Sequence, residues 1–221
     1  MVSWIEKIRK VSRAFNDLSK RYEQWYSEES GELIKEIEVR AMKKLIPGGT
    51  GLEVGVGSGI FASEVGINFG VDPAEKLLLK ARSKGVDVTL GIGEMLSFKS
   101  STFDFLLFVI SLAFLEDPQR SLDEARRVLK EGGAVLVCFV PKESSWGDLY
   151  GKKKRKGHDF YKHANFYSNS RVESLIEEAG FRIESAVSTL FQDPGSVVAL
   201  EEPVEHFDES AGFCCIRAER D

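Results

Sequence analysis

The sequence GLEVGVGSG, at positions 51–59, sets the fold class of this 221-residue chain. It places glycines at Gly55, Gly57 and Gly59, directly after a short and mostly apolar run. A doubly wound α/β fold needs glycines where its first strand turns into its first helix, because side chains there would block a nucleotide ligand. The stretch therefore predicts a strand, a glycine turn and a helix at a ligand-binding edge of a sheet.

The spacing of these glycines distinguishes between ligands. Enzymes that bind dinucleotides favour G-x-G-x-x-G, with the helix N-terminus facing a pyrophosphate, whereas Ile60 stands where that pattern has its last glycine. Glu53 lies two positions before Gly55, and its carboxylate would repel a pyrophosphate but attract a cation. S-adenosylmethionine (SAM) carries a sulfonium and an ammonium and has no phosphate. The turn therefore indicates a SAM site and argues against an NAD-linked oxidoreductase.

A second acidic residue follows at the distance that nucleotide folds use. An apolar run over 67–71 ends at Asp72-Pro73, and Asp72 lies 72 − 53 = 19 positions after Glu53. In these folds an acidic residue about 20 positions downstream accepts hydrogen bonds from the ribose hydroxyls. The alternative is that Asp72 and Pro73 only form the turn that opens a helix over 74–84.

The rest of the chain continues the alternation of strands and helices. The run over 103–110 is continuously apolar, as expected of a strand buried on both faces of a parallel sheet. The other expected elements are strands over 86–90, 134–140, 181–190 and 212–220, helices over 121–130 and 171–179, a turn at 131–133, a helix cap at 168–170, and an irregular loop over 191–210.

In this order of motifs the chain resembles the class I SAM-dependent methyltransferases, specifically the small-molecule branch called methyltransferase type 11. The matching motifs are the turn at 51–59, Gly70-Val71-Asp72-Pro73, the segment 91–98, Leu115-Glu116-Asp117-Pro118 and the segment 127–133. The resemblance implies an α/β fold with a doubly wound, seven-stranded, mostly parallel Rossmann-like sheet. Its last two strands would be antiparallel, and an N-terminal helical cap would precede it.

The resemblance also implies contacts to SAM. The glycines of the turn would let the backbone approach the methionine and ribose parts, with Glu53 near the ammonium. Asp72, followed by Pro73, would bind the ribose hydroxyls. The other implied contacts are Gly59 in the turn, Gly93 and Glu94 at the edge of the adenine, Met95 near its face, and Val109 and Ile110 beneath the methionine arm.

The chain departs from the family pattern at two places. Ile92 stands where many relatives carry Asp or Thr bonded to the adenine amino group, so adenine recognition would shift to backbone groups or to Glu94. Ala113-Phe114 replaces a turn that commonly contains histidine, so a catalytic or substrate role of that histidine cannot be carried over.

Aromatic residues of the flanking regions are the candidates for the acceptor pocket. Region 3–46 is expected to be helical because its apolar residues recur at steps of three and four, with a second helix over 31–45. The candidates are Tyr22, Trp25 and Tyr26 in this cap, Phe114 after the fourth core strand, and Trp146, His158 and Tyr161 further along. For the aromatics of the cap, the alternative is that they anchor its core.

The insertion over 141–170 leaves the carboxyl end of a core strand, where ligands of α/β sheets bind, so it is expected to act as a lid. Its basic run at 152–156 predicts a solvated, mobile loop. A gate for an anionic acceptor and a nucleic-acid contact are the alternatives. The acidic residues at 201–205 are expected to be solvated, with binding of a cationic amine acceptor as the alternative.

Composition limits the function classes. The net charge of −5 argues against a nucleic-acid partner, since phosphate binding usually needs a broad basic surface. The sequence has no apolar run of the roughly 18 residues that span a bilayer, and no signal-peptide pattern, so we expect a cytoplasmic protein without a membrane partner. We expect one domain with segments 1–46, 47–140, 141–170 and 171–221, as a monomer or a homodimer.

The three cysteines and three histidines show no metal-ligand spacing, so no metal site is predicted. Cys138 falls in an expected buried strand. Cys214 and Cys215 are adjacent and would point to opposite faces of a strand, which favours neither a metal site nor a disulfide. An odd number of cysteines fits a reducing compartment.

The predicted reaction is transfer of the SAM methyl group to a small-molecule acceptor by in-line displacement, with S-adenosylhomocysteine as product. Alignment in a water-poor pocket can supply most of the rate acceleration. A hydroxyl or carbon acceptor would want a general base, for which His158, His163 and Tyr26 are candidates; no catalytic residue is assigned. The alternatives are an RNA or protein methyltransferase and a SAM-binding protein without catalysis.

Overall fold

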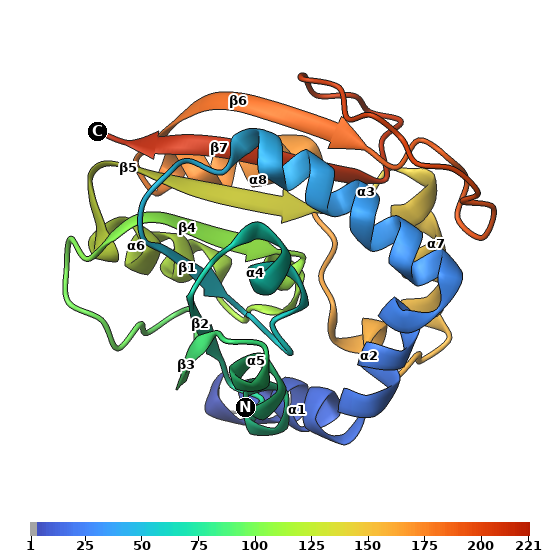
Figure 1. Ribbon diagram of the computed structural model, residues 1–221, viewed down its shortest axis with the longest axis horizontal. Coiled ribbons are helices and arrows are strands. Elements are labelled where there is room, and N and C mark those ends of the chain that lie inside the picture. The colour runs from blue at the N-terminus through green and yellow to red at the C-terminus, as the bar shows by residue number, and fades with distance from the viewer. Residues whose placement is uncertain (1–3) are drawn as a thin grey trace.

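The computed structural model describes residues 4–221, except for the side chains of Trp4 and Tyr22. Its centre is a seven-stranded sheet in the order β3-β2-β1-β4-β5-β7-β6 (Figure 1). The strands are β1 (Gly51–Val54), β2 (Phe69–Asp72), β3 (Asp87–Leu90), β4 (Phe103–Val109), β5 (Leu129–Phe139), β6 (Phe181–Thr189) and β7 (Phe213–Arg220). The first five run parallel, and β7 is antiparallel to both β5 and β6. The predicted sheet is confirmed.

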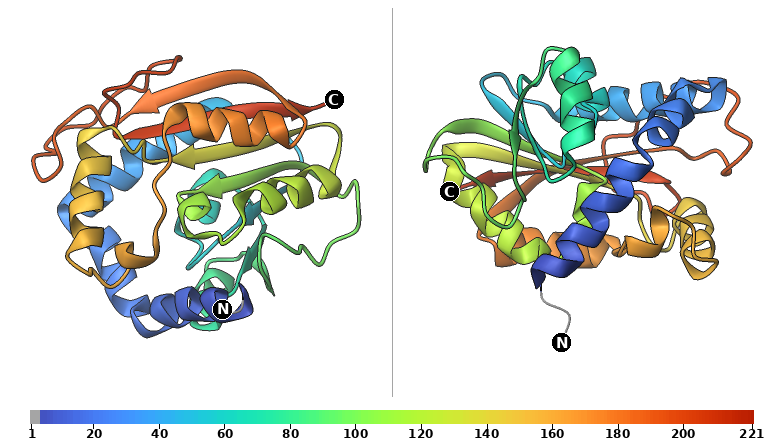
Figure 2. Two further views of the ribbon diagram at one scale, coloured as in Figure 1. Left: turned by 180° about the vertical axis from the view of Figure 1, so that it is seen from behind. Right: turned by 90° about the horizontal axis from the view of Figure 1, so that it is seen from below.

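Helices cover both faces of the sheet and the edge at which its parallel strands end. Figures 1 and 2 show α3, α4 and α5 on one face and α6 and α8 on the other, while α1, α2 and α7 form a rim at that edge. The helices are α1 (Trp4–Asp17), α2 (Ser19–Ser27), α3 (Glu29–Leu45), α4 (Ile60–Val65), α5 (Glu75–Ser83), α6 (Pro118–Val128), α7 (Ser145–Arg155) and α8 (Asn169–Glu178), with 3-10 turns η1 (Ser111–Phe114) and η2 (Tyr161–His163). Within residues 4–221, no helix is both long and apolar enough to cross a membrane.

Apolar packing on both faces holds the sheet between its helices. All residues of β4 except one are buried, as its apolar run predicts for a central parallel strand. Alternate side chains of β4 point to opposite faces, so Phe105 packs in the cluster that includes Ile37 of α3, and Leu106 packs with Leu122 of α6. The sheet is thereby fixed with its carboxyl edge toward the rim helices.

Two element boundaries differ from the sequence prediction. Helix α6 begins at Pro118 instead of 121, because Asp117 caps it by accepting a hydrogen bond from the Arg120 amide at 3.0 Å. Strand β5 begins at Leu129 instead of 134. The expected turn at 131–133 is a register irregularity inside this strand, with Gly132 at φ +70°.

The basic run at 152–156 is not a loop, and that expectation is wrong. These residues form the last turn of α7 and its C-cap, where positive charge is favoured by the helix dipole. Ser144 opens the helix by accepting a hydrogen bond from the Gly147 amide at 3.0 Å. Lys154 donates a hydrogen bond to the Ala164 carbonyl at 2.5 Å, which ties the turn to the following segment.

The cysteines also differ from the expectation. Cys138 of β5 lies directly opposite Cys215 of β7, and the two form a disulfide. Cys214 points to the other face of β7, as predicted for adjacent residues of a strand, and is a buried free thiol. The sequence reasoning missed the pair because the two cysteines are 77 residues apart and only the sheet register brings them together.

Candidate active site

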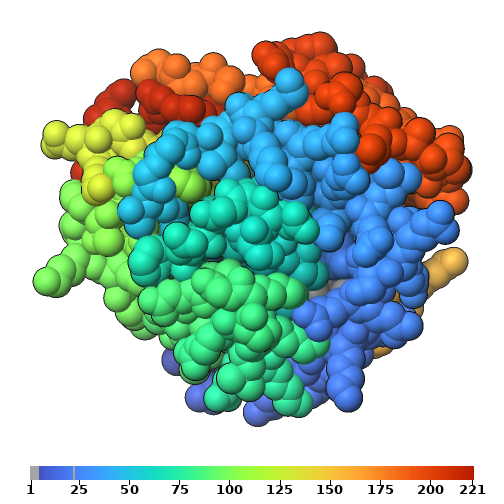
Figure 3. All heavy atoms as spheres, viewed as in Figure 1, coloured from blue at the N-terminus to red at the C-terminus, as the bar shows by residue number. Residues whose placement is uncertain are grey.

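A cavity of about 510 Å³ lies at the carboxyl edge of the sheet, beneath the rim helices. We call the part of its wall around Gly55, Gly57 and Asp72 the cofactor side, and the part around Glu38 and Tyr150 the acceptor side. In Figure 3 the blue residues of α2 and α3 meet the cyan and green residues of α4 and α5 along a narrow seam, which shows how closely the cap is packed against the core on that face.

The glycine turn is held in place by its own backbone. The amides of Gly55 and Val56 donate hydrogen bonds to the Val71 carbonyl at 2.8 and 3.1 Å. Gly57 has φ +52°, and a Cβ built there would find only Leu77 Cδ1, at 3.9 Å. The space beside Gly57 is therefore cavity, and the turn offers bare backbone to a ligand.

Asp72 stands at the end of β2, next to this turn. Its Oδ2 accepts a hydrogen bond from the Gly57 amide at 2.9 Å, and its Oδ1 accepts one from the Ala74 amide at 2.7 Å. Burial raises the pKa of Asp72 to about 6, although these two hydrogen bonds oppose the rise. Asp72 and Pro73 both line the cavity.

Glu53 lies near the end of β1, and its side chain is buried beside the cavity wall without being part of it. Its side chain is 1% exposed, its Oε2 has no hydrogen-bond partner, and it is not among the residues that line the cavity. Burial raises the pKa of Glu53 well above its usual range, partly opposed by the Ala62 amide. A contact with the SAM ammonium stays a prediction.

The segment after β3 is used structurally in this chain. Glu94 Oε1 accepts hydrogen bonds from the amides of Glu116 and Asp117 at 2.9 and 3.3 Å, which fixes the start of α6. Met95 is 59% exposed. Together with Gly59 and Gly93, these residues lie outside the cavity wall, so their contacts with the cofactor also stay predictions.

Val109 and Ile110 line the cavity at the end of β4, where the resemblance places the floor. Ile110 has φ +58°, a conformation that a β-branched residue rarely adopts and that strains the backbone. Its amide donates a hydrogen bond to the Cys138 carbonyl at 2.7 Å, which holds the strained turn beside the cavity.

Helix α1 covers the cofactor side. The Ser12 hydroxyl donates a hydrogen bond to the Pro73 carbonyl at 2.6 Å, and the Lys76 amide donates one to Asn16 Oδ1 at 2.8 Å. Phe15 packs edge-on against Phe114, with ring centroids 5.1 Å apart. Ser12 and Phe15 line the cavity, so α1 forms part of the cover over the carboxyl edge of the sheet.

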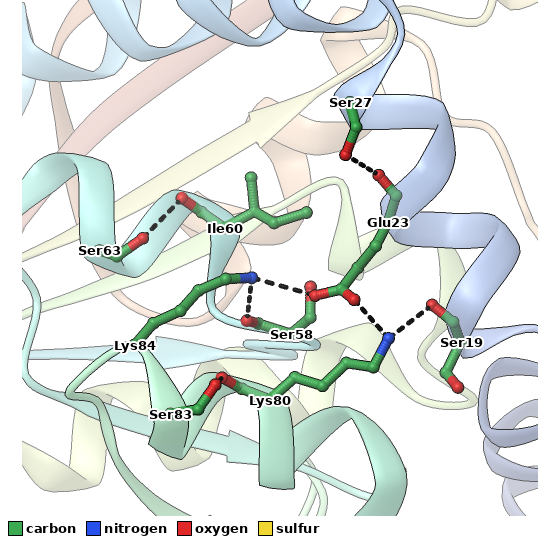
Figure 4. Close-up of polar contacts among 9 residues, drawn as sticks. All are labelled: Ser19, Glu23, Ser27, Ser58, Ile60, Ser63, Lys80, Ser83 and Lys84. Carbon is green, nitrogen blue, oxygen red and sulfur yellow. Dashed lines mark hydrogen bonds and ion pairs between the residues drawn. The ribbon is translucent and has the colours of Figure 1, made fainter.

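A polar cluster joins α2 to the glycine turn and α5, as Figure 4 shows. Glu23 of α2 forms ion pairs with Lys80 and Lys84 of α5. Lys84 also donates a hydrogen bond to the Ser58 carbonyl at 2.9 Å, and Lys80 donates one to the Ser19 carbonyl at 3.3 Å. We call these three charged residues the Glu23 clamp. It fastens the cap directly to the turn.

Most of the aromatic candidates reach the cavity. Five of the seven candidates line the cavity, namely Trp25, Tyr26, Phe114, His158 and Tyr161. Trp146 lies away from it: its indole is 3% exposed, donates a hydrogen bond to the Gln192 carbonyl at 3.0 Å and packs against Gly212. The side chain of Tyr22 lies outside what the structure describes.

The acceptor side contains residues that the sequence reasoning missed, namely Glu38, Tyr150 and Phe166. Lys153 of the basic run also lines the cavity, although only as one residue of a run for which a gate was an alternative. Glu38 was detectable, because it falls on the apolar face of α3 between Ile34 and Met42. Tyr150 and Phe166 were not, because α7 and the segment after it reach the cavity only through the tertiary fold.

Burial shifts the pKa values of the ionisable groups on the acceptor side. Burial lowers the pKa of His158, and the charges of Lys153 and Arg21 lower it further. Burial also lowers the pKa of Lys153 and raises that of Glu38 to about 8. Of the candidate bases, His158 and Tyr26 line the cavity, whereas His163 does not. No group of described residues could hold a metal ion.

These features fit SAM. Gly57 presents a cradle that a Cβ would fill, Asp72 places an acidic edge beside it, and Ile110 supplies an apolar floor. The turn does not suit a pyrophosphate. The amides of Gly55 and Gly57 already donate hydrogen bonds within the protein, and the carboxylate of Asp72 would repel a phosphate.

Comparison with known proteins adds to this picture. A family model described as "Methyltransferase domain" matches residues 52–137. An uncharacterised protein of Methanocaldococcus jannaschii is 37% identical over 206 residues, which cover 93% of this chain and 98% of that protein. A crystal structure from Thermotoga maritima, described as a "SAM-dependent methyltransferase, possible histamine N-methyltransferase", has a TM-score of 0.90 at 37% identity, over 96% of this chain and 100% of that one. The demethylmenaquinone methyltransferase of Corynebacterium kroppenstedtii is 28% identical over 140 residues, 60% of this chain and 61% of that one.

Proposed function

This chain belongs to the SAM-dependent methyltransferases, and on that premise we propose that it methylates a small molecule bound on the acceptor side of the cavity. The observation that carries the proposal is that helices cover the cavity. Its cofactor and acceptor sides together measure about 510 Å³ and lie beneath α1 and α2. A polymer chain would need an open groove, whereas a small molecule can be surrounded by aromatic side chains.

The names of two relatives support the same class. A demethylmenaquinone methyltransferase acts on a quinone, and a "possible histamine N-methyltransferase" points to a small amine. The net charge of −5 counts against the RNA alternative.

When bound, SAM supplies a methyl group activated by a sulfonium. We propose that Gly55 and Gly57 let the backbone approach it and that Asp72 accepts hydrogen bonds from its ribose hydroxyls. Trp25 and Tyr26 would exclude water from the acceptor and restrict its orientation. Because the leaving group is good, this alignment accounts for most of the acceleration.

Calorimetric titration with SAM, S-adenosylhomocysteine and NAD tests the cofactor site. We expect micromolar binding of the first two and none of NAD. Formation of S-adenosylhomocysteine with a panel of small amines, thiols and phenols then tests the acceptor class. Turnover of RNA or protein with none of the small molecules would contradict the proposal.

A further inference from the structure

A carboxylic acid occupies the apolar face of α3, where helix periodicity predicts an apolar side chain. Ile34, Ile37, Ala41 and Met42 surround this position on the same face, and all four are buried. Glu38 itself is only 4% exposed, and it lines the cavity. The helix therefore directs an acid into the acceptor side.

The described part of the chain provides no partner for this acid. Glu38 Oε2 is buried without a hydrogen bond, and burial alone shifts its pKa, with no contribution from a neighbouring positive charge. A buried carboxyl without a partner costs stability. Its presence is explained if a group that enters the cavity pairs with it.

Aromatic rings form the wall around this acid. Tyr150 and Tyr161 are stacked with their centroids 4.5 Å apart, and Tyr150 also lies 6.1 Å from Phe166. Burial raises the pKa of both tyrosines, and the charge of Glu38 raises each further. The two phenols are therefore neutral neighbours of the acid.

The amino group of Lys153 already lies close to the rings of this wall. Lys153 Nζ lies 5.5 Å from the ring centroid of Tyr150 and 5.6 Å from that of Tyr161. These distances are within the range of cation–π attraction. The same faces can attract an ammonium ion that comes from a ligand.

We propose that the methyl acceptor is a primary or secondary amine that enters as its ammonium ion, and that Glu38 binds it and accepts its proton. The inference rests on the proposed function, since it names the acceptor class for the same site. An aromatic wall and one buried carboxylate are the features that distinguish such an ion from a neutral alcohol or an anion.

Glu38 then acts as a general base. The N–H bond of the ammonium breaks, its electron pair stays on nitrogen, and the proton forms an O–H bond with Glu38. The nitrogen is left neutral with a lone pair, which is the form that can attack a methyl group. An ammonium nitrogen has no lone pair and cannot attack, so the proton must leave before the methyl group is transferred.

Titratable side chains share the cavity wall with Glu38, but burial alone shifts its pKa. Lys153 of α7, Arg21 of α2 and His158 supply the positive or titratable groups of the wall, and Tyr150 and Tyr161 are neutral. Burial raises the pKa of Glu38 to about 8, so the free protein at pH 7 holds this proton. An ammonium ion beside the acid favours its ionised form, so amine binding should release up to about one proton to the buffer.

Calorimetry on the full chain saturated with S-adenosylhomocysteine tests the proposal without turnover. The probes are 2-phenylethylamine, 2-phenylethanol and 3-phenylpropionate, with butylamine and butanol as a second matched set. We expect each amine to bind at least tenfold more tightly than its alcohol. Titrations in two buffers of different ionisation enthalpy should show the released proton.

Two substitutions on the acceptor side should act in opposite directions. Glu38→Gln keeps the size of the side chain but removes the base, so amine affinity should fall at least tenfold and proton release should disappear. Lys153→Met removes a like charge, so amine affinity should rise severalfold. Glu32→Gln, an exposed residue of the same helix, is the matched control and should change neither.

The outcomes separate this inference from the proposed function. Amines that bind no more tightly than their alcohols would overturn it, as would unchanged amine binding in Glu38→Gln, provided that this variant still binds S-adenosylhomocysteine. Tighter binding of 3-phenylpropionate than of 2-phenylethylamine by the unmodified chain would indicate an anionic acceptor and also overturn it. If Glu38→Gln does not fold, the sign of the Lys153→Met effect decides. Failure of the unmodified chain to bind S-adenosylhomocysteine would instead count against the proposed function.

Discussion

On the cofactor side of the cavity, both oxygens of Asp72 accept backbone hydrogen bonds, whereas on the acceptor side Glu38 and His158 each bury a polar atom without a partner. Behind the glycine turn, Glu53 Oε2 and Ser58 Oγ are also buried without partners, but neither residue lines the cavity. The acid that does line the cofactor side, Asp72, is bound by the turn and by the Ala74 amide. The acceptor side keeps hydrogen-bonding capacity that only a ligand can use. A site that always binds the same cofactor benefits from rigid, hydrogen-bonded groups. A site that selects an acceptor can leave polar groups without protein partners, so that the acceptor supplies the hydrogen bonds.

The two sides also differ in how their parts are joined. The cofactor side comes from segments that are neighbours in the sheet, and short hydrogen bonds hold it. The acceptor side brings α2 and α3 together with α7 and the segment after it, more than 100 residues away. Substitutions should therefore act locally on the first side and reveal ligand preference on the second.

The largest expected effect is on the cofactor side. Gly57→Val should abolish measurable S-adenosylhomocysteine binding, a loss of more than about 100-fold, because the new side chain enters the cavity. Calorimetry measures it. Gly66→Val is the matched control: it also has a positive φ, of +77°, but nothing lies within 4 Å of its Cβ and it does not line the cavity. Equal loss of binding in both variants would mean that backbone strain, and not the cradle, is responsible.

The next effect concerns stability on the acceptor side. Burial raises the pKa of Glu38 from its ordinary value of 4.5 to about 8 in the folded state, so the folded state holds more protons between these pH values. The free energy of unfolding should therefore fall as pH rises from about 4.5 to about 8. Glu38→Gln should remove this loss and be more stable than the unmodified chain by about 2–4 kcal/mol at pH 8, with little difference at pH 4.5.

Urea unfolding across this pH range measures the effect of Glu38→Gln. The exposed variant Glu32→Gln should stay within about 0.5 kcal/mol of the unmodified chain at every pH. A Glu38→Gln protein that is less stable at pH 8 would show that the carboxylate has a partner inside the fold, and the contrast between the two sides would fail.

A smaller effect tests the ribose contact of Asp72. Asp72→Ala should weaken S-adenosylhomocysteine binding by about 1–3 kcal/mol, through a lost charge-assisted hydrogen bond. Because Asp72 also holds the glycine turn, the titration is repeated with the 2′-deoxy analogue of the ligand. If Asp72 binds the ribose, the unmodified chain should discriminate between the two ligands and the variant should not. Equal discrimination in both proteins would leave Asp72 with only its structural role.

The smallest effect is expected at the Glu23 clamp, which joins the cap to both sides. Glu23 and its two lysines are each about one-third exposed, so Glu23→Gln should cost less than about 1 kcal/mol of unfolding free energy. Hydrogen exchange should show faster opening of α2, and high salt should reduce the difference from the unmodified chain. Glu64→Gln, which removes an exposed ion pair with Lys35, is the control and should leave α2 unchanged.

Most of the core architecture was predictable from local pattern. The glycine turn, Asp72 and the apolar run of β4 each carry their information in a few consecutive residues, so their spacing alone indicated the sheet and the cofactor. The exceptions are informative. Asp117 caps α6 earlier than expected, and the basic run extends α7, because capping and the helix dipole outweighed the turn and loop tendencies of those residues.

The sequence by itself determined the family, the sheet and the cofactor, since contiguous motifs encode them. The tertiary structure alone decided which side chains meet on the acceptor side, that Trp146 is a core residue, and that Cys138 faces Cys215. Glu38 lies between these cases: periodicity marks it as an acid on an apolar face, but only the tertiary fold, which brings α3 and α7 to one cavity, shows that the acid lines it. Contacts between distant segments depend on how whole elements pack, and no local spacing records that.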